Sequence, residues 1–470
     1  MLTSFFRTAT PLTRLFFALA TASVLMAQTL QPGDYLGTVR IGVTSLRMAL
    51  HLGQNPDGTW GGTMDSIDQG AFGMPIRNLT LVGSAVRFGN FEGTLNADGD
   101  VSGRLMQGGS AVPVVFRKVA KIEPPARPQL PSKPYPYNEV EVEFENKSAG
   151  VRIAGTLTWP KTTGPFAAAI LLTGSGPQDR DSTMFGHKPF LVLADDLTRR
   201  GFAVLRMDDR GVGKSTGSVA RSTFEDLARD ATLAVEFLRT RKEIDPKAIG
   251  IIGHSEGGFI APMVAQAAFV VLLAGPGVPG ETLLYEQGQA VLRAVNATPN
   301  VRDRQHQLQH LLFTAVQSER DPAKLEVWMR AAVAEFKATI SPAELVATPG
   351  FDQQMEGEIR RMMLPELQSF VRHDPRPYLN ALKCPVLAMI GSLDTQVSAK
   401  QNLPAIAGAL LSTSDFEVVS LPGLNHMFQT ARTGAVGEFA TIEETISPIA
   451  LETLGAWFRR HFPQLPPPNR

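Results

Sequence analysis

The segment with the clearest chemical potential is residues 253–257, which read Gly-His-Ser-Glu-Gly. It follows the apolar run 248–252 and precedes further small and apolar residues. Between a buried strand and a helix, a serine with glycines two positions away on both sides occupies a tight turn that exposes its hydroxyl. Ser255 is therefore a candidate nucleophile, although so short a motif also occurs by chance in ordinary glycine-rich turns.

A serine nucleophile needs two partners, because its hydroxyl is almost fully protonated at neutral pH. An imidazole must take the proton, and a carboxylate must orient the imidazole. Asp394 follows the apolar run 386–390 in the sequence Gly-Ser-Leu-Asp, and His426 follows the run 416–421 in the sequence Asn-His-Met-Phe. Both are expected on loops at the carboxyl edge of one sheet, in the chain order serine, acid, histidine.

Other polar residues near these motifs favour structural roles. His254 is expected to pack or hydrogen-bond behind the nucleophile, since neighbours on a sharp turn point in different directions. Residues 179–181 (Asp-Arg-Asp) could contact substrate, but a loop-bracing ion pair is the stronger interpretation, and Asp208 and Asp209 are expected to stabilise a turn. The remaining histidines of interest lack a position at a strand end and are expected on the surface: His187, His306, His310 and His373.

The elements that must position these residues alternate between strand and helix. Capping-box spacing at Ser222 and Glu225 predicts a helix start. Apolar runs and helical periodicity predict the following elements: a hairpin at 140–144 and 151–159, buried strands at 167–172, 202–207 and 269–274, and helices at 188–200 and from 222 onward. This alternation indicates an α/β domain with a mostly parallel sheet and helices on both faces.

The alternation stops at about residues 280–382, where helix-forming residues predict a helical insertion. Its large apolar residues could line a pocket, but for any one of them the insertion's own core is the stronger expectation. These residues are Tyr285, Trp328, Phe336, Met362 and Met363. Residues 446–462 then predict a closing amphipathic helix with Pro448 in its first turn.

The amino-terminal part has a different organisation. Residues 1–27 combine a short charged start, an apolar centre and small residues at the end, which predicts a secretory signal peptide and export. A retained amphipathic anchor is the alternative, but the apolar part is too short for a stable membrane span. Asp-Gly turns between alternating runs predict a β-rich accessory domain at 28–119, followed by a proline-rich linker at 120–136 and a catalytic domain at 137–470.

Composition excludes several classes of partner. Lys and Arg number 45, as do Asp and Glu, so the net charge is zero and no basic surface for nucleic acid is implied. The single cysteine, Cys384, excludes an intramolecular disulfide and is expected as a buried small residue. Oligomeric state cannot be derived from these features.

Residues 137–470 resemble the α/β-hydrolase superfamily, with 253–257 as the nucleophile elbow. Residues 172–181 stand where that family builds its oxyanion loop, and 208–215 match its Asp-x-Arg-Gly-x-Gly-x-Ser turn. Within the superfamily the chain is similar to bacterial carboxylesterases and dienelactone-hydrolase-like enzymes, which neighbour the prolyl oligopeptidase (S9) group. The resemblance implies an elbow formed by Gly253, His254 and Gly257, and a catalytic triad.

The family's oxyanion hole implies two backbone donors. One is the N–H of Glu256, the residue after the nucleophile, and the other comes from Ser175 or Gly176. Many relatives have His-Gly where this chain has Thr173-Gly174, so the choice between the two loop donors stays open.

These features predict hydrolysis of a small-molecule carboxylic ester, with no metal or organic cofactor needed. About 90 amino-terminal residues are too few for a four-bladed propeller like those of oligopeptidases, which favours esters over peptides. An exported serine peptidase or amidase of the S9-like type is the alternative. A third hypothesis is a non-catalytic binding protein on a hydrolase scaffold, and the complete set of Ser255, Asp394 and His426 argues against it.

Overall fold

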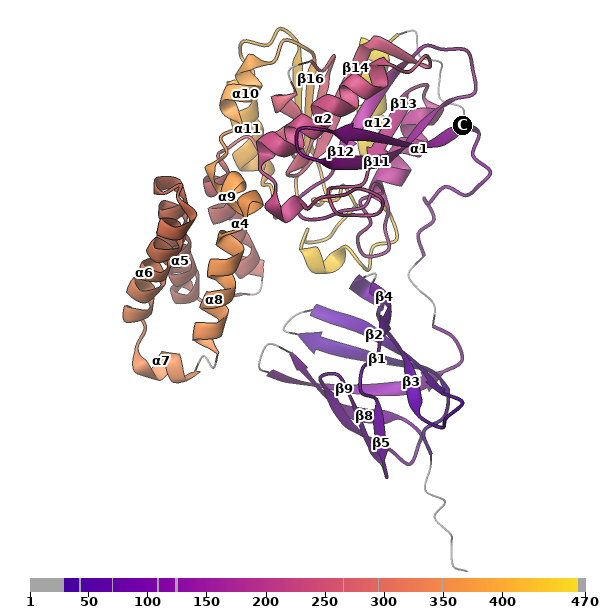
Figure 1. Cartoon of the computed structure of the whole chain (residues 1–470), viewed down its shortest axis with the longest axis vertical. Helices are drawn as coiled ribbons and strands as arrows, with labels where there is room; N and C mark the ends of the chain where they lie inside the picture. The colour runs from indigo at the N-terminus through magenta and orange to yellow at the C-terminus, as the bar shows by residue number, and fades with distance from the viewer. Residues whose placement is uncertain are drawn as a thin grey trace, which may run out of the picture.

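The computed structural model describes residues 29–41, 44–69, 71–107, 110–122, 126–264, 266–294, 296–347 and 350–463. The segment 1–27, expected as a signal peptide, lies outside these residues, as do residues 123–125 of the expected linker. The described residues form two sheets, one in an amino-terminal β domain and one in a larger α/β domain (Figure 1).

The amino-terminal β domain is one nine-stranded antiparallel sheet in the order β4-β3-β2-β1-β9-β8-β7-β6-β5. Its strands are β1 (Gly33–Ile41), β2 (Thr44–Gln54), β3 (Trp60–Ser66), β4 (Ala71–Pro75), β5 (Thr80–Val82), β6 (Ala85–Phe88), β7 (Phe91–Leu95), β8 (Val101–Gln107) and β9 (Ser110–Val119), with a 3₁₀ turn η1 (Ile67–Gln69). The predicted Asp-Gly turns join β2 to β3 and β7 to β8, where Gly58 and Gly99 have φ values of +81° and +85°. Tyr35, Phe91 and Phe116 are fully buried in this domain's own core.

The α/β domain is built on an eight-stranded sheet in the order β10-β11-β13-β12-β14-β15-β16-β17. Its strands are β10 (Tyr137–Asn146), β11 (Val151–Pro160), β12 (Phe166–Leu172), β13 (Ala203–Met207), β14 (Ile244–His254), β15 (Val270–Leu273), β16 (Val386–Gly391) and β17 (Phe416–Leu421). The β10–β11 hairpin is antiparallel, as is the β11–β13 pair, and all other neighbours are parallel. This is the mostly parallel sheet that the sequence predicted.

Helices cover both faces because the buried strand residues alternate between two cores. Ile170 and Ile251 face one core, whereas Leu171 faces the other. The first core is covered by α2 (Phe224–Arg239), α3 (Gly257–Ile260), η3 (Ala261–Met263), α10 (Arg376–Ala381) and α11 (Ala399–Ala409). The second is covered by α1 (Pro189–Arg199) and α12 (Pro448–His461). Short 3₁₀ turns occur at η2 (Val219–Arg221) and η4 (Val436–Glu438).

The start of α2 differs from the expected capping box. The cap is Thr223, which accepts from the Asp226 backbone N–H while the Asp226 side chain accepts from the Thr223 backbone. Ser222 is engaged elsewhere, since its hydroxyl donates to the Ser218 carbonyl and accepts from Arg210. The helix therefore begins one residue later than the sequence indicated.

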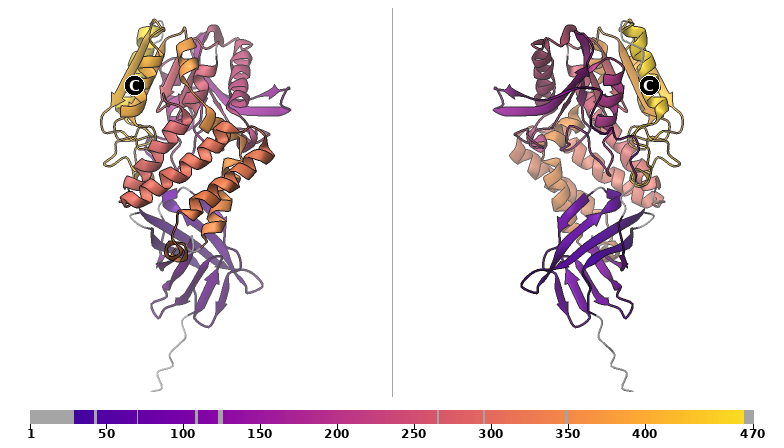
Figure 2. Two further views of the ribbon diagram at one scale, coloured as in Figure 1. Left: turned by 90° about the vertical axis from the view of Figure 1, so that its left-hand side faces the viewer. Right: turned by 90° about the vertical axis from the view of Figure 1, so that its right-hand side faces the viewer.

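The insertion between β15 and β16 forms a helical cap. Besides α10, its helices are α4 (Gly280–Ala294), α5 (Pro299–Ser318), α6 (Pro322–Ala338), α7 (Pro342–Ala347), α8 (Phe351–Met362) and α9 (Pro365–Arg372). Phe336 and Met362 are buried in a core that the cap forms by itself, with Tyr285 and Met363 packed against it, while Trp328 is exposed. Figures 1 and 2 show the cap and the amino-terminal sheet at the same end of the α/β domain.

Candidate active site

The Gly-x-Ser-x-Gly turn joins the end of β14 to the short helix α3. Ser255 has a φ of +54°, a left-handed conformation that a residue with a side chain adopts only when its surroundings enforce it. A Cβ on Gly253 would lie 2.1 Å from the Gly257 carbonyl oxygen, and one on Gly257 would lie 2.5 Å from that of Leu172. Glycine is therefore required at both flanking positions, and the turn is sharp because the backbones pass so close together.

Asp394 and His426 meet on neighbouring loops after β16 and β17. Asp394 Oδ2 lies 2.8 Å from His426 Nδ1, and both side chains are almost fully buried. Asp394 Oδ1 accepts hydrogen bonds of 2.8 Å from the backbone N–H groups of Gln396 and Val397. A carboxylate on Nδ1 makes that nitrogen the donor, which leaves Nε2 as the atom able to take a proton.

His254, inside the turn, is placed behind His426. Its Nε2 donates a hydrogen bond of 3.0 Å to the His426 carbonyl oxygen. Burial, followed by the neighbouring His426, lowers the pKa of His254 to about 4, so the ring is neutral at neutral pH. The contact positions the His426 loop, in line with the packed histidine that the sequence predicted.

Ser255 and His426 line one cavity of about 570 Å³. The cap contributes apolar side chains to its wall, among them Leu283, Leu367 and Phe370. Among the described residues Ser255 Oγ has no hydrogen bond to the imidazole. Bonds of this kind commonly tighten only when substrate binds.

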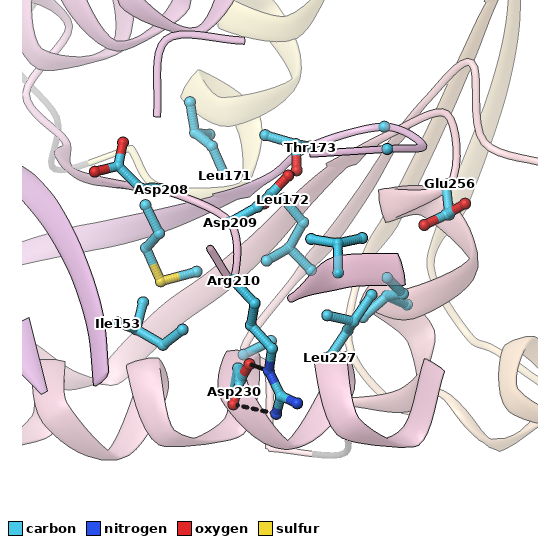
Figure 3. Close-up of a pocket in the computed structure, with 16 residues that line it drawn as sticks. Ile153, Leu171, Leu172, Thr173, Asp208, Asp209, Arg210, Leu227, Asp230 and Glu256 are labelled. Carbon is cyan, nitrogen blue, oxygen red and sulfur yellow. Dashed lines mark hydrogen bonds and ion pairs between the residues drawn. The ribbon is translucent and has the colours of Figure 1, made fainter. Parts of the chain in front are cut away.

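The loop after β12 is anchored to Asp209. Thr173 Oγ1 donates to Asp209 Oδ1 at 2.7 Å, and the backbone N–H of Gln178 donates to Asp209 Oδ2 at 2.9 Å. Burial raises the pKa of Asp209 to about 7. Figure 3 shows Thr173 and Asp209 side by side at a small pocket of about 60 Å³, which Glu256 also lines.

Two further carboxylates contact the same loop. Ser175 Oγ donates to Glu256 Oε2 at 2.7 Å, and the Gly176 backbone N–H donates to Glu366 Oε1 at 3.0 Å. Burial, followed by the charges of Glu366 and Asp209, raises the pKa of Glu256 to about 8. Sequence reasoning missed Glu366, which lies in the first turn of α9 in the cap and 190 residues from Gly176.

The Asp-Arg-Asp segment braces the site from outside. Arg180 donates to both carboxylate oxygens of Asp208, at 3.0 and 2.6 Å. Asp181 forms ion pairs with Lys188 and Arg206. The cavity that Ser255 lines is not lined by Asp179, Arg180 or Asp181, which fits the loop-bracing role predicted for this segment.

The expectation of surface histidines is wrong for two of the four. His187 is buried, contacting the Thr445 hydroxyl and the Phe439 carbonyl, and burial lowers its pKa to about 4. His373 is buried in contact with the rings of Phe224 and Tyr378. Local sequence patterns did not predict this burial, because both partners of His187, and Phe224 beside His373, come from distant segments. His306 and His310 are exposed as expected.

Within the described ranges, no three His, Cys, Asp or Glu side chains are grouped so that they could hold a metal ion. No helix of those ranges has the length and apolar character that crossing a membrane requires.

Comparisons with known proteins agree with this architecture. A family model described as "Serine aminopeptidase, S33" matches residues 188–430, just over half of the chain. Esterase EstD of Thermotoga maritima is 32% identical over 164 residues, which are 34% of this chain and 39% of that protein. The uncharacterized protein YfhR of Escherichia coli K12 is 32% identical over 127 residues, 27% of this chain and 41% of that protein.

The chain thus spans only about 40% of the length of these curated relatives. Among solved structures, an esterase from Pyrococcus furiosus aligns with a TM-score of 0.41 and 17% identity, covering 71% of this chain and 97% of that one.

Proposed function

The chain belongs to the S33 serine aminopeptidase family of α/β-hydrolases, and from that premise we propose that it hydrolyses carboxylic esters through an acyl-enzyme on Ser255. The chain belongs to a hydrolase family, and the proposal concerns the bond that it cleaves, the nucleophile and the catalytic triad. The observation that carries the proposal is that His426, which is paired with Asp394, lines the same cavity as the strained Ser255.

In the proposed reaction, Ser255 Oγ attacks the acyl carbon while His426 Nε2 takes its proton. His426 then gives that proton to the departing alkoxide, and the acyl-enzyme remains. Water attacks the acyl-enzyme by the same route and releases the acid. Asp394 keeps the imidazole in the required tautomer and stabilises the imidazolium that forms in each step.

The negative oxygen of each tetrahedral intermediate would be held by the backbone N–H groups of Glu256 and Ser175. Neither N–H donates a hydrogen bond to another described residue, so both are free to bind substrate. The Gly176 N–H is already donated to Glu366. This contact supports Ser175 over Gly176 as the second donor.

The leaving group is proposed to be an alcohol, and two observations support this. Apolar side chains of the cap, among them Leu283, Leu367 and Phe370, line the cavity, and the Thermotoga maritima relative is named an esterase. The family description, serine aminopeptidase, favours amide hydrolysis as the second candidate.

A panel of p-nitrophenyl esters of increasing acyl length, run beside aminoacyl p-nitroanilides, separates the two candidates. Ester turnover should exceed anilide turnover, and Ser255→Ala should lose about 10⁶-fold in kcat. Ser318→Ala, at an exposed position on α5, serves as the matched control and should leave the rate unchanged. Equal ester and anilide rates would favour the aminopeptidase, and full turnover by Ser255→Ala would refute the mechanism.

A further inference from the structure

The hydrogen bond from the Gly176 N–H to Glu366 joins the cap to the loop beside the nucleophile. Glu366 is part-buried at the start of α9, and its carboxylate lines the same cavity as Ser255. The bond is 3.0 Å long and runs from a backbone donor to one carboxylate oxygen. The position of the cap is therefore coupled directly to the backbone of this loop.

The peptide that joins Ser175 to Gly176 is held from both edges. Its carbonyl accepts a hydrogen bond of 3.2 Å from Gln178 Nε2, and its N–H is the group bound by Glu366. Gln178 belongs to the loop itself, whereas Glu366 belongs to the cap. Removing the Glu366 carboxylate would leave this peptide held on one edge only.

The same loop passes close to the nucleophile. A Cβ built on Gly174 would lie 3.3 Å from Ser255 Cβ, so the backbone at residue 174 is in near contact with the serine. The N–H of Ser175 belongs to the peptide that joins Gly174 to Ser175. The following peptide, Ser175–Gly176, is the one whose N–H is bound by Glu366. Because the two peptides share the Ser175 Cα, the orientation of the Ser175 N–H depends on this contact.

We propose that Glu366 is a positioning residue, which holds the Ser175–Gly176 peptide so that the Ser175 N–H faces the oxygen of the tetrahedral intermediate. This inference rests on the proposed function, because it assigns a role within that reaction. The N–H of Gly176 is then a structural group, and the oxyanion hole is complete only when α9 of the cap is seated on the loop.

The role requires a hydrogen-bond acceptor and does not require a negative charge. Glu366 faces Glu256 across the site, and the reaction develops a further negative charge nearby. An uncharged acceptor of the same length should therefore serve as well as the carboxylate. This expectation distinguishes a positioning role of Glu366 from the binding of a cationic substrate, which would need the negative charge of the carboxylate.

The test compares Glu366→Ala and Glu366→Gln in the full chain, with a p-nitrophenyl ester as substrate. Glu366→Ala should lower kcat by about 10- to 100-fold with little change in KM, since misplacing an oxyanion donor affects the transition state. Glu366→Gln should recover most of that loss, because the amide oxygen can accept the Gly176 N–H. Glu335→Ala, at an exposed glutamate on α6, is the control in the same cap.

A second readout uses phenylboronic acid, which forms a tetrahedral adduct with an active serine. Its affinity should fall in Glu366→Ala by the same factor as kcat/KM and should recover in Glu366→Gln. An increase in kcat in Glu366→Ala would mean that Glu366 blocks the true donor, and equal losses in both variants would mean that its charge is what matters. Either result, or no change at all, would overturn the proposal.

A failure of the Glu366 proposal can be distinguished from a failure of the proposed function. Failure of the function would appear in the wild type, as absent ester turnover, or as turnover retained by Ser255→Ala. Failure of the Glu366 proposal would leave both of those results intact. Thermal unfolding of each variant identifies any change in kcat that comes from a damaged fold.

Discussion

The triad loops and the oxyanion loop line the same cavity but are held in different ways. Asp394 is held by backbone N–H groups two and three residues further along the chain, and it binds His426 on the adjacent strand-end loop. The oxyanion loop is tied to Asp209, Glu256 and Glu366, which come from three separate parts of the chain. The triad loops are thus held by contacts between neighbouring strand ends, whereas the oxyanion loop depends on side chains from distant parts of the chain.

The difference also affects how each part responds to pH. Burial raises the pKa of Asp209 to about 7 and that of Glu256 to about 8, so these two carboxyls titrate near neutral pH. The contacts of the oxyanion loop are therefore expected to change with pH near neutrality and to depend on the position of the cap.

Of the contacts that hold the triad loops and the oxyanion loop, the Asp394–His426 contact should give the largest effect when it is changed, by Asp394→Asn. The two backbone donors would keep the amide oxygen at the position of Oδ1, which turns the NH₂ group toward His426 Nδ1. Nδ1 must then accept, Nε2 carries the proton, and the base is lost. We expect kcat to fall by about 10⁴-fold in ester hydrolysis.

Asp352→Asn, at an exposed position on α8, controls for a general effect of removing a carboxylate. A loss of less than about tenfold in Asp394→Asn would contradict the orienting role of this residue. Thermal unfolding should show that both variants remain folded.

A smaller effect is expected from Glu256→Gln, measured as stability against pH. Burial raises the pKa of Glu256 to about 8, whereas the ordinary pKa of a glutamate side chain is 4.5. The native state thus binds more protons in this interval, and the free energy of unfolding falls as pH rises through it. Glutamine does not titrate, so the Tm of the variant should rise relative to that of the wild type as the pH increases from about 5 to 8.

Glu335→Gln, at an exposed site, should give a Tm curve parallel to that of the wild type. Parallel curves for Glu256→Gln as well would show that the buried carboxyl does not hold its proton. The expected pH response of the oxyanion loop would then lose its basis.

The fold class was predictable from the sequence, because its signals are local. Continuous apolar runs such as 167–172 and 386–390 favour strands buried on both faces, and β12 and β16 occupy these positions. The loops that carry Asp394 and His426 follow such strands directly. The sheet then brings the ends of β16 and β17 together, as parallel neighbours in register from Val386 to Gly391.

Contacts between distant segments were not predictable. Nothing around Glu366 indicates that it binds a backbone group 190 residues away, since an acidic residue in the first turn of a helix is common on helix-dipole grounds alone. His187 and His373 were misjudged for the same reason. Their burial is created by packing against elements that no local pattern identifies.

The measurement that tests the central claim most directly is labelling by a p-nitrophenyl phosphonate, followed by mass spectrometry of the digested protein. This reagent traps an activated serine as a stable tetrahedral adduct. We predict one adduct per chain on the peptide that contains Ser255, and none on Ser255→Ala. An adduct on a different residue, or equal labelling of Ser255→Ala, would contradict acyl transfer through this serine.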